Sequence, residues 1–188
     1  MNDVVRIAGI AGSLRKGSLN KSVLRAAVKL APKGSVLDMV DLEGIPGFNE
    51  DLEQNFPPPA REFKVKVKGA DAILIVTPEY NYSVPGVLKN AIDWASRPYG
   101  DSAWNAKPVA IMGASPGMLG TARAQYHLRQ MFVFLNMFPL NQPEVMIANA
   151  AEKVNGQGEL KDEETLQRIK VMLESLVEWT RQLRKARA

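Results

Sequence analysis

The chain has 188 residues, a net charge of +4 and one histidine, and it contains no cysteine. This length suits one domain, which we expect to span residues 1–188. Without cysteine the chain forms no disulfide, thiolate metal site or cysteine nucleophile. Because His127 is the one histidine, zinc is not expected, and we predict no metal site.

The basic excess is confined to the end of the sequence. Four cations lie within the last eight residues, and the rest of the chain is neutral: Arg181, Arg184, Lys185 and Arg187. Cations at the end of a helix complement its macrodipole, so we interpret them as a solvated helix end. We therefore expect no nucleic-acid partner.

Membrane insertion and secretion are not expected either. No apolar run reaches the ~18 residues that a membrane helix needs. Asp3 lies where a signal peptide carries only cations. The sequence predicts a cytoplasmic protein that binds no membrane.

Short apolar runs alternate with longer amphipathic ones along the whole chain. Periodicity predicts strands at residues 4–10, 35–42, 71–77, 108–114 and within 140–148, and helices at 19–31, 61–69, 84–96, 120–138 and 162–187. The valines of 61–69 also allow a strand, and the Pro- and Gly-rich stretch 43–60 is predicted as a long loop. This alternation indicates a parallel sheet with helices on both faces, which binds ligands at the carboxyl ends of its strands.

The loop after the first strand reads GSLRKGSLNKS, residues 12–22. A helix begins near its Ser18, and a helix N-terminus presents free N–H groups to an anion. The loop adds two hydroxyls, an amide and a guanidinium: Ser13, Ser18, Asn20 and Arg15. The stretch lacks the P-loop lysine and the glycines of the dinucleotide motif. It predicts a phosphate site, the alternative being a Ser-capped helix after a flexible turn.

The loop after the third strand reads TPEYNYSVPG, residues 77–86. Pro78 keeps Thr77 extended, so several N–H groups of the loop face the rim of the sheet. Tyr80 and Tyr82 offer flat faces to a planar ring, and Ser83 is predicted to cap the next helix. An ordinary strand-to-helix turn with surface tyrosines is the alternative. The loop after the fourth strand, GASPGMLG, is glycine-rich and allows a ligand to approach closely.

The pairing of GSLRKGSLNKS with PEYNYSVPGVLKNAIDWASRP resembles the NADPH-dependent FMN reductase family, in its quinone and chromate reductase branch. The resemblance implies a flavodoxin-like α/β fold, a five-stranded parallel sheet of order 2-1-3-4-5 with helices on both faces, and bound FMN. It assigns the FMN phosphate to Ser13, Arg15, Ser18, Leu19 and Asn20. It places Pro78, Glu79, Tyr80 and Asn81 beside the isoalloxazine, and Ser115 and Gly117 near the ribityl chain or ring.

The implied activity is reduction of quinones, chromate or other acceptors by NADPH or NADH, in two half-reactions at one flavin. No catalytic side chain is predicted, because the flavin carries the chemistry. The alternatives are a flavodoxin-type FMN electron carrier and a reductase of free flavin or azo dyes. His127 is interpreted as a helix-surface or interface residue.

The stretch 120–138 has more apolar side chains than one helix face can bury. An inner stripe is predicted to cover the sheet: Leu128, Met131, Phe132 and Leu135. A second set would be exposed on a monomer: Tyr126, Val133, Phe134 and Met137. We expect a homodimer or homotetramer that pairs this helix and 84–97 across a two-fold axis and brings 48–56 over the neighbouring flavin. Polar contacts are expected from Arg123, Tyr126 and Glu144.

Overall fold

The computed structural model describes residues 4–187, so the expectation that rested on Asp3 lies outside the described residues. The described chain forms a parallel sheet of order β2-β1-β3-β4, and both β5 and β6 pair with β4. The strands are β1 (Val5–Ala11), β2 (Ser35–Val40), β3 (Ala72–Val76), β4 (Pro108–Ala114), β5 (Phe138–Pro139) and β6 (Val145–Ile147). The predicted order 2-1-3-4-5 is confirmed, although two short strands share the fifth position.

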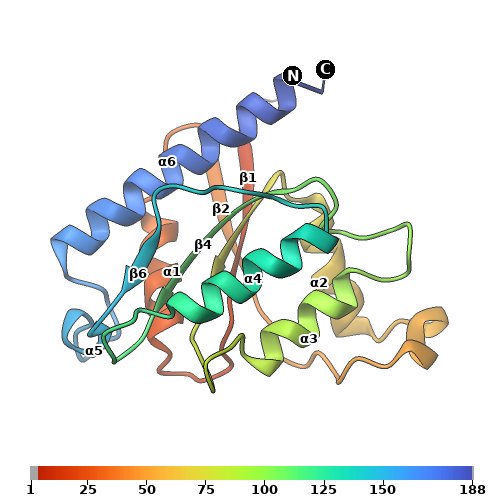
Figure 1. The fold of residues 1–188 in the computed structure, drawn as a ribbon, viewed down its shortest axis with the longest axis horizontal. Helices are drawn as coiled ribbons and strands as arrows, with labels where there is room; N and C mark the ends of the chain where they lie inside the picture. Colours follow the sequence, from red (N-terminus) through yellow and green to blue (C-terminus); the bar gives the residue numbers. More distant parts are fainter. Residues whose placement is uncertain (1–3, 188) are drawn as a thin grey trace.

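Helices cover both faces of this sheet (Figure 1). They are α1 (Leu19–Lys29), the 3₁₀ helix η1 (Glu50–Asn55), α2 (Pro58–Gly69), α3 (Gly86–Ala95), α4 (Ala122–Phe134), α5 (Ala150–Lys153) and α6 (Glu163–Lys185). On one face, α1 and α6 pack Leu24 and Leu173 against Ile7 and Leu74 of the strands. On the other, α2, α3 and α4 bury Phe63, Leu88 and Leu128 against strand residues such as Ile75. The central strands are thus covered on both sides, as the alternation of strands and helices predicted.

Differences from prediction concern the ends of elements. The 120–138 helix stops at Phe134, because Asn136 adopts a left-handed conformation with φ 52° and turns the chain back toward the sheet. Met137 is therefore buried at 6% exposure, and its expected exposure was wrong. The inner stripe is confirmed for Leu128, Phe132 and Leu135, each 7% exposed or less.

The stretches around the helices hold two elements that the sequence did not predict. The expected long loop contains η1, which opens with Asn49 as a side-chain cap. The short helix α5 follows β6 directly. Helix α2 settles the ambiguous stretch 61–69 as helical.

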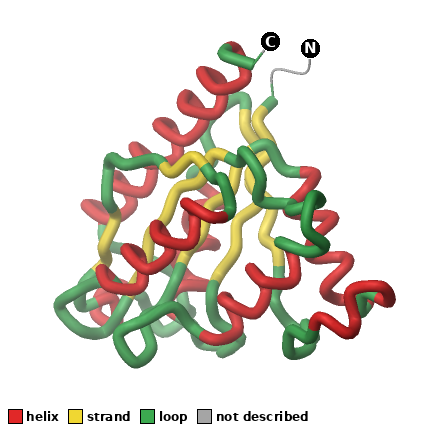
Figure 2. The backbone as a smooth tube through the Cα atoms, turned by 45° about the vertical axis from the view of Figure 1, so that its right-hand side comes forward, coloured by secondary structure: helices red, strands yellow, loops and turns green. Residues whose placement is uncertain are grey.

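The basic end of α6 is packed rather than wholly solvated. Arg184 Nη2 lies 2.6 Å from a carboxylate oxygen of Asp71, at the start of β3. Arg187 donates to the Ala106 carbonyl and lies over the Phe138 ring. These contacts hold the C-terminal end of α6 at the amino edge of the sheet. Figure 2 shows the C-terminal end of the chain at this edge.

Two further observations bear on function. None of the helices within residues 4–187 is long and apolar enough to cross a membrane. The same residues contain no group of three or more His, Asp or Glu side chains that could hold a metal ion.

Candidate functional site

The carboxyl ends of β1, β3, β4 and β6 meet at one edge of the sheet. Ala11 lies beside Val76, and Ala114 lies beside Ile147. The chain stays tight beyond β1, because Gly12 N donates to the Val76 carbonyl at 2.9 Å. A Cβ on Gly12 would lie 3.0 Å from Leu88 and 3.2 Å from Pro78, so a small residue is required between the first two loops. The three loops named from the sequence are therefore neighbours.

The first loop presents donors around the start of α1. Ser18 caps this helix, its Oγ accepting from Lys21 N, and leaves the N–H groups of Leu19 and Asn20 without an intrahelical acceptor. Ser13 Oγ accepts from Arg15 N at 3.3 Å. Both serines are nearly buried, and each hydroxyl keeps its proton for a further acceptor. Arg15 is exposed and forms no ion pair within the described chain.

The side chain of Asn20 pairs with the end of β4. Its Nδ2 donates to the Ala114 carbonyl and its Oδ1 accepts from Ala114 N, both at 2.9 Å. The amide thus pairs with the last residue of β4 as a neighbouring strand would. The backbone N–H and the second Nδ2 hydrogen of Asn20 are not used in these two bonds, so the expected donor role of Asn20 stays a prediction.

The second loop is a tight hairpin. Tyr80 and Ser83 exchange both backbone hydrogen bonds, and Asn81 and Tyr82 between them have φ of 49° and 64°. Two positive φ values at the central residues define a type I′ turn. Helix α3 begins later, at Gly86, so Ser83 is not its cap. Instead Ser83 Oγ lies 2.9 Å from His127 Nδ1 on α4, which places the histidine at a contact between elements.

Glu79 anchors this hairpin to α4. Thr121 precedes α4 in a left-handed conformation and provides no side-chain cap. Glu79 Oε2 accepts from Arg123 N at 3.0 Å and from Ala124 N at 3.2 Å, so this carboxylate caps α4 from another element. The Arg123 guanidinium pairs with Glu79 and lies 3.4 Å from the centre of the Tyr82 ring. The hydrogen bond with Glu79 raises the pKa of Arg123.

The third loop is held by α5. Ser115 N donates to the Ile147 carbonyl, and the carbonyls of Ser115 and Gly117 accept from Ala150 N and Asn149 N. Ser115 Oγ donates to the Gly117 carbonyl at 3.1 Å. This ladder leaves the tip of the loop, with Gly117, exposed at the same edge as the first two loops.

Sequence reasoning identified the two tyrosines of an apolar rim on these loops but missed its leucines and its methionine. Five large side chains from the three loops are 45% to 84% exposed: Leu14, Tyr80, Tyr82, Met118 and Leu119. Grouped exposed apolar side chains mark binding sites on soluble proteins. The sequence could have indicated this rim, because leucine and methionine occur in loops that join a buried strand to a helix, where they are seldom needed for the stability of the loop.

The three loops together fit FMN. The free N–H groups and hydroxyls at α1, with Arg15, suit a phosphate. The apolar rim suits a planar ring, and the backbone of the Pro78–Asn81 segment borders the same edge. The expected site residues therefore lie at one edge, except that the side chains of Asn20 and Glu79 are engaged with β4 and α4.

Such a sheet, with its ligand loops at the carboxyl edge, defines a flavodoxin-like α/β protein. The solved structure of FerB, described as a flavoenzyme NAD(P)H:(acceptor) oxidoreductase from Paracoccus denitrificans, superposes with a TM-score of 0.87 at 36% identity, covering 95% of this chain and 98% of that one. A flavodoxin WrbA-like protein of Agrobacterium tumefaciens shares the fold at 12% identity and a TM-score of 0.61.

Sequence comparison identifies the family. The profile of the family described as NADPH-dependent FMN reductase matches residues 5–152. An NAD(P)H-dependent FMN reductase of Pseudomonas aeruginosa is 50% identical over 185 residues, covering 98% of this chain and 100% of the relative. A 2-hydroxy-1,4-benzoquinone reductase of a Burkholderia species is 44% identical over 96% of this chain and 98% of the relative. The chain belongs to the NADPH-dependent FMN reductase family, as the two loop motifs predicted.

Proposed function

We propose that this protein is an FMN-dependent NAD(P)H oxidoreductase that reduces quinones. The observation that carries the proposal is one edge of the sheet that joins free N–H groups and hydroxyls, at the start of α1, to an exposed apolar rim. The relatives named as an FMN reductase and a benzoquinone reductase support it, because each aligns over nearly the whole chain.

The chain's own residues bind and orient the cofactor. Ser13, Ser18 and Arg15, with the N–H groups of Leu19 and Asn20, would hold the FMN phosphate. The Pro78–Asn81 backbone would border the isoalloxazine, and Ser115 and Gly117 the ribityl side. When bound, FMN supplies the redox chemistry, accepting a hydride from NAD(P)H and returning electrons to an acceptor.

The N–H groups of the hairpin would stabilise negative charge that develops on the bound flavin. Its N–H groups near Asn81 lie in a turn fixed by two backbone hydrogen bonds and by the Glu79 carboxylate on α4. Donors held in advance stabilise developing charge without reorganising. No side chain needs to act as an acid or base, and we assign none.

Acceptors beyond quinones belong to the same proposal. An exposed rim admits chromate, azo dyes and free flavin as well as quinones, and either NADPH or NADH as donor. A flavodoxin-type electron carrier is the competing function. The reductase is favoured because the relatives that align over nearly the whole chain are named as reductases, whereas the flavodoxin WrbA-like protein shares only the fold, at 12% identity.

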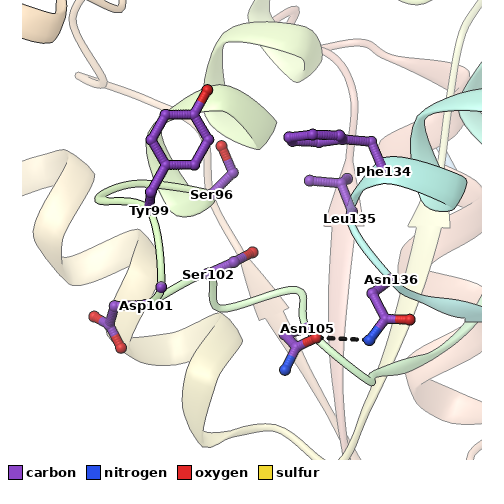
Figure 3. A pocket seen from close by; sticks show the side chains of 9 residues that line it. Ser96, Tyr99, Asp101, Ser102, Asn105, Phe134, Leu135 and Asn136 are labelled. Atoms are coloured by element: carbon purple, nitrogen blue, oxygen red, sulfur yellow. Dashed lines mark hydrogen bonds between the residues drawn. The ribbon is translucent and has the colours of Figure 1, made fainter.

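We also propose that the protein is a homodimer or homotetramer assembled through α4. Val133 is 83% and Phe134 74% exposed, and Tyr126 lies half-exposed on the same helix. Phe134 and Tyr99 lie on opposite sides of a pocket of about 490 Å³, whose far end is closed by the Asn136–Asn105 hydrogen bond (Figure 3). These exposed side chains would be buried by a second copy.

Segment 48–56 was expected to lie over the flavin of a neighbouring subunit, but the two ends of this segment pack against their own chain. Phe48 and Phe56 both contact Trp94 of the same chain, with ring centres 5.1 and 4.9 Å apart from it. The acidic η1 between them remains exposed for a partner. Arg123 already pairs with Glu79, so any contact with a second copy would use its remaining donors.

The test is to purify the protein, add FMN, and follow NADPH absorbance at 340 nm with benzoquinone present. We expect FMN to copurify or to restore activity, and the NADPH absorbance of the FMN-loaded protein to fall faster when quinone is added. FMN binding without NADPH or NADH oxidation would identify an electron carrier instead.

A further inference from the structure

A second cavity lies beside the phosphate loop, along α1. It has a volume of about 610 Å³ and is bounded by α1, the tip of the third loop and the turn after α5. Pro116, which lies between the two third-loop residues expected to border FMN, forms part of its wall. The cavity is therefore continuous with the edge that we assign to the flavin.

The charge of this cavity is positive. Arg15, Lys16 and Arg25 line it, and no carboxylate of the described chain does. None of the three forms an ion pair within residues 4–187. The nearby Glu159 instead pairs with Lys29 and Lys161. Unpaired cations around one concave surface favour an anionic ligand.

Arg25 is held in place for such a ligand. Its Nη2 donates to Ser22 Oγ at 3.0 Å and to the Gly158 carbonyl at 3.1 Å. Both acceptors are neutral, so the charge of the guanidinium is not compensated, and its remaining N–H groups can bind a phosphate. The turn that carries Gly158 is itself ordered, because Asn155 Oδ1 accepts from the N–H groups of Gln157 and Glu159.

The FMN phosphate does not account for Arg25. This residue lies seven positions after the Ser18 cap, which corresponds to about 10 Å along the helix axis at 1.5 Å per residue. The Arg25 guanidinium is held at Ser22 Oγ and the Gly158 carbonyl, one turn beyond the Ser18 cap, and not at the free N–H groups of Leu19 and Asn20. The apolar part of the lining, Leu19, Pro116, Ala151 and Val154, offers a surface for a purine ring between them.

We propose that this cavity receives the adenosine end of NADPH, with the 2′-phosphate bound by Arg25 and Lys16. The proposal rests on the proposed reductase function and deepens it, because it predicts a preference for NADPH over NADH. An arginine beside the ribose is a known means of selecting the 2′-phosphate in other nucleotide-binding folds.

Isothermal titration of the FMN-loaded protein tests the binding part. The probes are adenosine 2′,5′-bisphosphate and 5′-AMP, which differ only in the 2′-phosphate. We expect the bisphosphate to bind the wild type about tenfold more tightly, and Arg25→Gln and Lys16→Gln each to reduce that difference several-fold. Lys29→Gln is the matched control, because Lys29 lies one turn further along α1, faces Glu159 and does not line the cavity.

Steady-state kinetics supply the second arm. The ratio of kcat/KM for NADPH to that for NADH should fall several-fold in Arg25→Gln and stay unchanged in Lys29→Gln. Equal binding of the two probes by a wild type that oxidises NADPH would overturn this assignment alone, as would an equal loss with both donors in Arg25→Gln. Failure of the FMN-loaded wild type to oxidise either donor would overturn the proposed function and the assignment with it.

Discussion

Replacement of Glu79 tests how the flavin-facing hairpin is held. The carboxylate is only 7% exposed and accepts from two N–H groups in the first turn of α4, a helix with no side-chain cap of its own. Loss of a capping side chain costs about 0.5–2 kcal/mol. A carboxylate at a helix N-terminus adds about 0.3–1 kcal/mol through the macrodipole. Glu79→Ala should therefore lower the free energy of unfolding by about 2 kcal/mol.

Thermal unfolding of the apoprotein measures this change. For a chain of this size, 1 kcal/mol corresponds to about 2–4 °C in Tm, so Glu79→Ala should melt about 4–8 °C below the wild type. Glu79→Gln keeps one accepting oxygen and should lose about half as much. Asp93→Ala is the matched control, since Asp93 forms an i,i+4 pair with Lys89 on a helix surface and should cost about 0.3–0.5 kcal/mol.

Flavin titration of the same variants separates positioning from stability. If Glu79 holds the hairpin, FMN affinity should fall in Glu79→Ala even at temperatures where the variant is fully folded. A Tm within 1 °C of the wild type, together with unchanged FMN affinity, would refute the reasoning. In that case water would bind the N–H groups of Arg123 and Ala124 as favourably as the Glu79 carboxylate does.

Four further predictions follow from the site and the surface. Arg15→Ala should weaken FMN binding about 10- to 100-fold in a fluorescence titration, through loss of a charge-assisted contact worth about 1.5–3 kcal/mol; unchanged affinity would remove Arg15 from the site. NADPH and benzoquinone should give parallel double-reciprocal lines, and intersecting lines would mean that both bind together. Phe134→Asp should split the oligomer in light scattering, because it places a charge in an apolar contact; a monomeric wild type would contradict the interface. Hydrogen bonds from Lys64 and Lys68 lower the pKa of Asp101 to about 2, below its unfolded value of 3.8. The ionised Asp101 therefore stabilises the fold above about pH 4, and this stabilisation is lost toward pH 2. In Asp101→Asn, the loss of stability measured between about pH 4 and pH 2 should be smaller than in the wild type.

The sheet was predictable from the sequence because short apolar strand segments alternate with amphipathic helices, and its order was implied by the resemblance of the two loop motifs to the family. Residues 108–114 form β4 with the bounds that the pattern predicted. The fifth strand was less predictable, because its position is divided between Phe138–Pro139 and Val145–Ile147, and a two-residue strand has no periodicity.

The site was predictable as a set of loops but not as a set of contacts. Ser18 was identified as the start of α1 by its residue type, and the structure confirms the cap. Asn20 and Glu79 bind partners that lie 94 and 44 residues away in the sequence. The residues around each position do not predict such distant hydrogen bonds. Ser83 was misassigned for the same reason, since a serine before a helix can equally bond a side chain from another element.

The Asn20 clamp on Ala114 has a consequence for folding. It joins the first loop to the end of β4 across 94 residues, and contacts of such sequence separation close late because their loop entropy is high. A folding intermediate that has formed β1, α1 and β3 but has not docked β4 would have a phosphate loop without its support. Recovery of flavin binding during refolding should therefore lag behind recovery of helical structure, which would make flavin binding a reporter of the docking of β4.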